Sequence, residues 1–149
     1  MNGRCADPNH ADTSGYTPLL VAAMLNDAPM ARLLMARGAD VNRATPAGMT
    51  PLMLAAQGGS PELIHGLLDR GADPNDRTRD GDTPLHLAVR WRNVAGIEVL
   101  LSRGADVRAT DEDGGTPLDE AQRGGDHRIV GMLTGGPEVH ANIRLAARE

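Results

Sequence analysis

Aromatic residues are almost missing from this chain. Its 149 residues include no Phe, and Tyr16 and Trp91 are the only Tyr and the only Trp. Lysine is missing too, so all 15 basic residues are Arg, against 20 Asp and Glu, and the net charge is −5. Because binding to phosphate backbones needs a concentrated basic face, the composition predicts no nucleic-acid partner.

Long hydrophobic runs and paired cysteines are also absent. The longest apolar stretch, around Leu19 to Leu25, is far shorter than the ~20 residues that a membrane-spanning helix needs, and the polar residues 1–4 do not have the pattern of a secretory signal. Cys5 is the only Cys, so we expect no internal disulfide and no Cys-based metal site. These absences predict a cytoplasmic protein without membrane contact. A secreted or periplasmic parent stays open if the chain is a fragment.

What the sequence does contain is an internal repeat. The tripeptide Thr-Pro-Leu occurs four times, each copy 33 residues after the last, at Thr17-Pro18-Leu19, Thr50-Pro51-Leu52, Thr83-Pro84-Leu85 and Thr116-Pro117-Leu118. Gly-Ala-Asp recurs with the same spacing at Gly38-Ala39-Asp40, Gly71-Ala72-Asp73 and Gly104-Ala105-Asp106. A fixed period of this length is typical of stacked repeat units.

Each unit carries the start and stop signals of two short helices. Thr before Pro is a favourable helix N-cap, because the Thr side chain accepts a backbone N–H and Pro has none to leave unpaired. About ten residues later comes a second set of N-caps, at Asp27, Ser60, Asn93 and Asp126. Gly38, Gly71 and Gly104 are placed to end the second helix in a left-handed conformation. Such helices are too short to be stable alone, so we expect the units to stack.

The stacking predicts columns of buried leucines. We expect one buried column at the Leu of each Thr-Pro-Leu tripeptide, at Leu19, Leu52, Leu85 and Leu118. Leucine pairs in the second helices, at Leu33-Leu34, Leu67-Leu68 and Leu100-Leu101, extend this core. Leu20 is expected to contribute to an apolar N-terminal end, since no complete unit precedes it.

The segments Asp80-Gly81-Asp82-Thr83-Pro84-Leu85-His86-Leu87-Ala88 and Val99-Leu100-Leu101-Ser102-Arg103-Gly104-Ala105-Asp106-Val107 closely resemble the ankyrin repeat family. The resemblance implies an all-α, right-handed solenoid of helix-turn-helix units joined by β-hairpin-like loops. We expect one domain over residues 1–149, with a partial repeat at 1–11, repeats at 12–44, 45–77, 78–110 and 111–137, and a helical tail at 138–149. In that tail Val139, Ile143 and Ala146 share one helical face.

No residue pattern indicates catalysis. There is no Gly-rich phosphate loop, and the five His residues lack metal-ligand spacing, so we expect no catalytic residue, cofactor or metal. For His86 the resemblance implies a structural hydrogen bond within its own repeat. The acidic runs Asp80-Gly81-Asp82 and Asp111-Glu112-Asp113-Gly114 lack the length and ligands of a calcium loop, and they are interpreted as solvated loop tips.

Function should lie at positions that the repeat framework leaves free. The resemblance implies that loop tips and first helices face a concave groove that binds other proteins. The candidate partner-binding residues are Tyr16, Met24, Leu25, Met49, Arg79, Asp80, Asp82, Arg90, Trp91, Glu112, Asp113 and Arg123. Large apolar side chains at such positions favour a protein partner, although Trp91 could instead pack into the gap at Gly58.

The sequence therefore predicts a non-catalytic protein-interaction module whose partner it does not identify. Two alternatives stay open. The chain could be a regulatory or targeting segment of a larger enzyme, or a scaffold that self-associates through its uncapped N-terminal repeat. A monomer is the default expectation.

Overall fold

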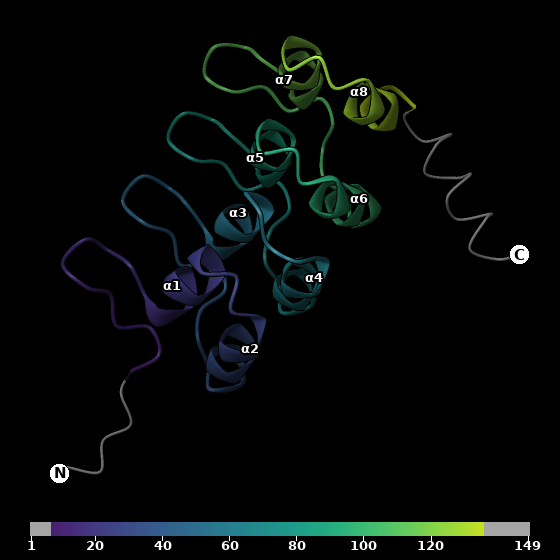
Figure 1. Cartoon of the computed structure of the whole chain (residues 1–149). Coiled ribbons are helices and arrows are strands. Elements are labelled where there is room, and N and C mark those ends of the chain that lie inside the picture. Colours follow the sequence, from purple (N-terminus) through teal and green to yellow (C-terminus); the bar gives the residue numbers. More distant parts are fainter. Residues whose placement is uncertain (1–6, 136–149) are drawn as a thin grey trace, which may run out of the picture.

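A computed structural model of the chain describes residues 7–135 and shows eight helices and no strand within that range. The helices are α1 (Pro18–Met24), α2 (Ala28–Ala36), α3 (Pro51–Ala56), α4 (Pro61–Asp69), α5 (Pro84–Arg90), α6 (Val94–Ser102), α7 (Pro117–Arg123) and α8 (His127–Thr134). They form four antiparallel pairs stacked side by side (Figure 1). The described part of the chain is thus an all-α solenoid of helix-turn-helix units, as the sequence predicts.

The helix ends lie where the Thr, Pro and Gly signals place them. Thr17 caps α1 by accepting the backbone N–H of Leu20, and the equivalent threonines cap α3, α5 and α7. The predicted N-caps of the second helices are found as well, for example Asn93, whose side chain accepts the N–H of Gly96. Gly38, which follows the C-cap of α2, has a φ of 94°, a conformation that favours glycine.

The pairs form two layers with a row of loops beside them. Helices α1, α3, α5 and α7 form the layer next to the loops, and α2, α4, α6 and α8 form the other layer (Figure 1). Each loop is closed by a backbone hydrogen bond, such as the one from Thr78 N to Asp82 O at 2.9 Å. Adjacent loops are also tied together, because Glu112 N donates to Asp80 O at 2.8 Å. The loops are turns rather than strands.

Asparagine side chains join the first three repeats to the segment before each of them. The Asn75 amide donates to Gly104 O at 3.1 Å, while its Oδ1 accepts the N–H of Asp106 at 2.7 Å. Asn42 makes the same two bonds to Gly71 and Asp73, and Asn9 makes them to Gly38 and Asp40. These bonds satisfy backbone groups at the C-terminal end of a helix that would otherwise lack partners.

The leucine columns are confirmed in the inner repeats and incomplete at the two ends of the stack. Leu19, Leu52 and Leu85 are fully buried, whereas Leu118 is only half-buried because no described helix pair follows it. Leu33, predicted to be in the core, is exposed, and Leu34 is half-buried.

The prediction for Leu20 was wrong. Its side chain is fully buried and belongs to a small cluster with Ala23 and Leu54. It therefore packs toward the second repeat rather than toward the N-terminal end.

Two predicted features lie outside the described residues. Cys5 and the start of the partial repeat precede them, and the predicted tail with Val139, Ile143 and Ala146 follows them. Within the described range, no helix has the length and apolarity required to cross a bilayer.

Candidate binding groove

We call the surface formed by the loop tips and the C-terminal ends of α1, α3, α5 and α7 the hairpin-side face. All twelve candidate partner-binding residues keep exposed surface. Nine are exposed and three, Tyr16, Met49 and Asp82, are half-buried. Their use by a partner stays a prediction.

The first repeat makes its end of this face apolar, and the second repeat adds the half-buried Met49. Met24, at the end of α1, is 53% exposed, and the following Leu25 is 69% exposed. Tyr16 and Met49 lie at the bases of the first two loops and pack against the small cluster around Leu20. The buried Leu20 cluster thus lies beneath Tyr16 and Met49.

Trp91 follows α5 and is 60% exposed. It does not fill the gap at Gly58, because a Cβ added to Gly58 would meet no atom within 4 Å. The alternative that Trp91 packs into that gap was therefore wrong. Exposing the large apolar side chain of a Trp to water is unfavourable, and Trp is strongly enriched at binding hot spots.

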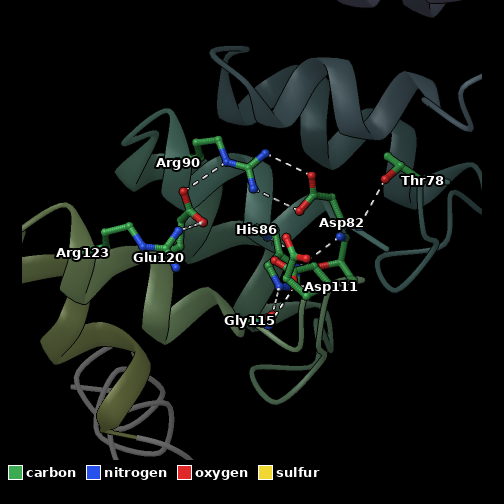
Figure 2. A network of polar contacts seen from close by, with 10 residues as sticks. Thr78, Asp82, His86, Arg90, Asp111, Gly115, Glu120 and Arg123 are labelled. Atoms are coloured by element: carbon green, nitrogen blue, oxygen red, sulfur yellow. Dashed lines mark hydrogen bonds and ion pairs between the residues drawn. The ribbon is translucent and has the colours of Figure 1, made fainter. Parts of the chain in front are cut away.

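An ion-pair network crosses the face between the third and fourth repeats (Figure 2). The guanidinium of Arg90 donates two hydrogen bonds to Asp82, at 3.0 and 3.1 Å, and its Nε donates to Glu120 Oε1 at 3.1 Å. Arg123 contacts the other oxygen of Glu120 at 3.6 Å. Arg90 and Asp82 were expected to be free positions, but each is already bound within the chain.

The network holds the Arg90 guanidinium, which is always charged, in one position. Hydrogen bonds to Asp82, and then to Glu120, raise the pKa of its guanidinium above the usual value. The Arg90 side chain stays partly exposed, so a partner would meet a charged group that is held in place rather than a mobile one.

The structure brings Asp82, His86 and Asp111 close enough to share a metal ion, a grouping that the sequence reasoning missed. These atoms have other partners. His86 Nδ1 accepts the Thr83 N–H at 3.2 Å, which leaves Nε2 to donate to Gly115 O at 3.0 Å. Asp111 Oδ1 accepts the N–H groups of Asp113 and Gly115.

The buried imidazole of His86 therefore joins its own N-cap to the next loop, and Asp82 is held by Arg90 (Figure 2). The hydrogen bond expected within its own repeat is present, whereas the bond to the next repeat was not foreseen. A metal ion would have to break the hydrogen bonds that support the fold. The trio fits a structural role.

The loop tips of the third and fourth repeats are acidic. Arg79, Asp80, Glu112 and Asp113 are exposed there, so the tips carry three carboxylates and one guanidinium. Between these repeats, at the ends of α5 and α7, lies a shallow cleft of about 210 Å³. Arg90, Glu120 and Arg123 line it together with Gly124.

Glu120 is the functional candidate that the sequence reasoning did not select. It occupies the position held by Leu54 and Leu87 in earlier repeats, which could have signalled a special contact. Its ion-pair partner Arg90 was selected. However, the sequence does not show that a side chain of one repeat extends to the next repeat.

The fold agrees with the comparison to known families. The family model described as "Ankyrin repeats (3 copies)" matches residues 2–78, 44–111 and 74–144. The chain belongs to the ankyrin repeat family. Members of this family are generally protein-interaction modules and are typically non-catalytic. No curated protein matches the chain.

Proposed function

We propose that the chain is a non-catalytic module that binds a protein segment along the hairpin-side face, with the loop tips and first helices forming a concave groove. The observation that carries the proposal is the exposure of Met24, Leu25 and Trp91 on this one face. The repeat framework does not need large apolar groups there, and exposed apolar clusters mark interaction sites.

The face also has a polarity that a partner would follow. Its first two repeats present apolar side chains, and its last two present acidic tips beside the fixed network of Arg90. Apolar contacts supply most of the affinity at such interfaces, while charges at the rim select the partner and speed association. The partner segment should therefore be apolar toward α1 and α3.

The test is affinity capture from cells of the source organism with three baits. The first bait is the wild-type chain and the second carries Met24→Ser and Trp91→Ala. The third is a control with Glu98→Ala, a substitution at an exposed residue of α6 in the other layer. We expect the same proteins on the wild-type and control baits, depleted at least tenfold on the second bait, in line with a loss of about 1.4 kcal/mol or more.

The captured partner should then be titrated against the purified chain. Trp91 is the only Trp, so its fluorescence reports directly on this face. Capture that is equally strong on the second bait, or a titration that leaves Trp91 emission unchanged, would show that partners bind elsewhere.

A further inference from the structure

The first repeat exposes a second group of apolar side chains, which begins at Val21, one helical turn from Met24 on α1. Val21 of α1 is 37% exposed, and Met30 and Leu33 of α2 are 44% and 43% exposed. We call these three residues the end face. Apart from them, the exposed large hydrophobic residues of the described chain are those of the hairpin-side face.

The equivalent positions of the later repeats are covered. Leu54 and Leu87, which stand 33 and 66 positions after Val21, are buried. Leu63 and Ile129, which stand 33 and 99 positions after Met30, are buried as well. Val99, 66 positions after Leu33, is buried too. These columns therefore belong to the seams between repeats, and among residues 7–135 the large apolar side chains in them are exposed in the first repeat and buried or half-buried in the later ones.

Contacts across the inner seams show what covers such a face. Leu54 packs against Leu20 and Ala23 of the repeat before it. A Cβ added to Gly66, at the Leu33 position of α4, would lie 3.8 Å from Met35 Cε. The face is thus built to receive an apolar helix.

Helix α2 has large side chains in both the Met30 column and the Leu33 column, whereas α4 and α6 each have a glycine in one of the two. Helix α4 has Leu63 with Gly66, and α6 has Gly96 with Val99. Helix α2 instead has both Met30 and Leu33. Retaining two large apolar groups at the open end favours a partner that this surface buries.

We propose that this partner is a second copy of the chain, seated with its own α2 antiparallel to the first. In a two-fold arrangement the same patch serves both copies, and Met30 of one copy then lies against Leu33 of the other. The ends of α2 support this direction. Asp27 caps its N-terminus and Arg37 its C-terminus, so antiparallel helices bring opposite charges together.

The charge nearest the centre of α2 does not oppose this pairing. Arg32 is ion-paired with Glu62 of the same chain, so two copies do not bring two unpaired guanidinium groups together. Antiparallel helices also place the partial charges at their ends next to charges of opposite sign. Val21 lies one helical turn from Met24 on α1, so the end face adjoins the hairpin-side face there, whereas Trp91 of the third repeat lies outside the end face.

The first test is sedimentation of the full chain from low to high micromolar concentration. We expect the weight-average mass to rise from 15.7 kDa toward twice that value. Leu33→Glu should abolish this rise. Ser102→Glu adds the same charge at an exposed position of α6, in the third repeat, and should leave the rise in place, while circular dichroism confirms that both variants are folded.

A second test does not depend on a destabilising charge. Leu33→Cys and, as its control, Ser102→Cys at the end of α6 are made in a Cys5→Ser background and oxidised. Near a two-fold axis, the Leu33→Cys chains should become covalent dimers, because a disulfide requires Cα atoms within about 7 Å.

Three results would overturn the proposal. They are a wild-type chain that stays monomeric throughout, dimers that persist in Leu33→Glu, and equal loss of dimers in Leu33→Glu and Ser102→Glu. Cross-linking that is no faster at position 33 than at position 102 would exclude the antiparallel arrangement.

Discussion

Substituting Gly96 by Ala tests whether the seam between α4 and α6 is as tightly filled as the structure indicates. A Cβ at this position would lie 2.6 Å from Asn93 Nδ2 and 3.0 Å from Ile64 Cδ1. Asn93 cannot easily move away, because its Nδ2 donates to Ala56 O and Gly59 O while its Oδ1 caps α6.

Two opposing effects determine the outcome. Replacing Gly by Ala inside a helix is worth up to about 1 kcal/mol, whereas forcing an extra methyl into a filled site typically costs about 1–3 kcal/mol. Displacing Asn93 adds about 0.5–1.5 kcal/mol for each hydrogen bond that is lost. We therefore expect Gly96→Ala to lower the free energy of unfolding by about 1–3 kcal/mol, measured by urea denaturation.

Gly66→Ala is the matched control. It lies in the middle of α4, and its new Cβ would meet only Met35 Cε, at an ordinary 3.8 Å. We expect it to raise stability by up to about 1 kcal/mol. If Gly96→Ala proved as stable as wild type with an unchanged urea dependence, the reasoning about this seam would be refuted. Adding Gly96→Ala in an Asn93→Ala background should cost less than it does in wild type.

Three further predictions concern the polar contacts. Arg90→Met should lower stability by about 1 kcal/mol, as expected of a partly exposed ion pair. In about 1 M salt the difference from wild type should shrink, because the charges are screened. Melting curves identical to those of wild type at both salt levels would contradict this. Asn75→Ala removes two hydrogen bonds across a seam and should cost about 1–3 kcal/mol in urea denaturation. Hydrogen bonds from the Thr116 N–H and hydroxyl lower the pKa of Asp119. The stability that Asp119 gives the fold is therefore present above the unfolded pKa of about 3.9, and it is lost as the pH falls through the folded pKa. Asp119→Asn should therefore be less stable at neutral pH, and its deficit should close in acid, as followed by thermal melts across that range.

Local structure was predictable because it depends on signals close together in the chain. The capping Thr and Asn residues and the glycines such as Gly38 act within a few positions of themselves. The helix ends found for α1 and α6 follow from such signals alone. Repetition then strengthens the prediction, since the same signals recur in register.

Contacts between repeats were not predictable in the same way. The position of Leu20 suggested an exposed end, but the neighbouring Leu54 covers it. Arg90 was selected as a free residue, although Glu120, 30 positions later, binds it. Periodicity says which positions are equivalent, whereas the reach of a long side chain into the next unit depends on its rotamer.

The side-chain bridges made by Asn42 and Asn75 make the inner repeats interchangeable. Removing residues 45–77 would bring Asn42 to the place of Asn75, opposite Gly104 O, without changing the hydrogen-bonding groups on either side. The equivalent residue of the third repeat, at position 108, is Arg instead of Asn. The seam between the third and fourth repeats therefore lacks the asparagine bridge. Chains shortened or lengthened by whole units should therefore tolerate the edit in the middle of the stack better than at its C-terminal junction.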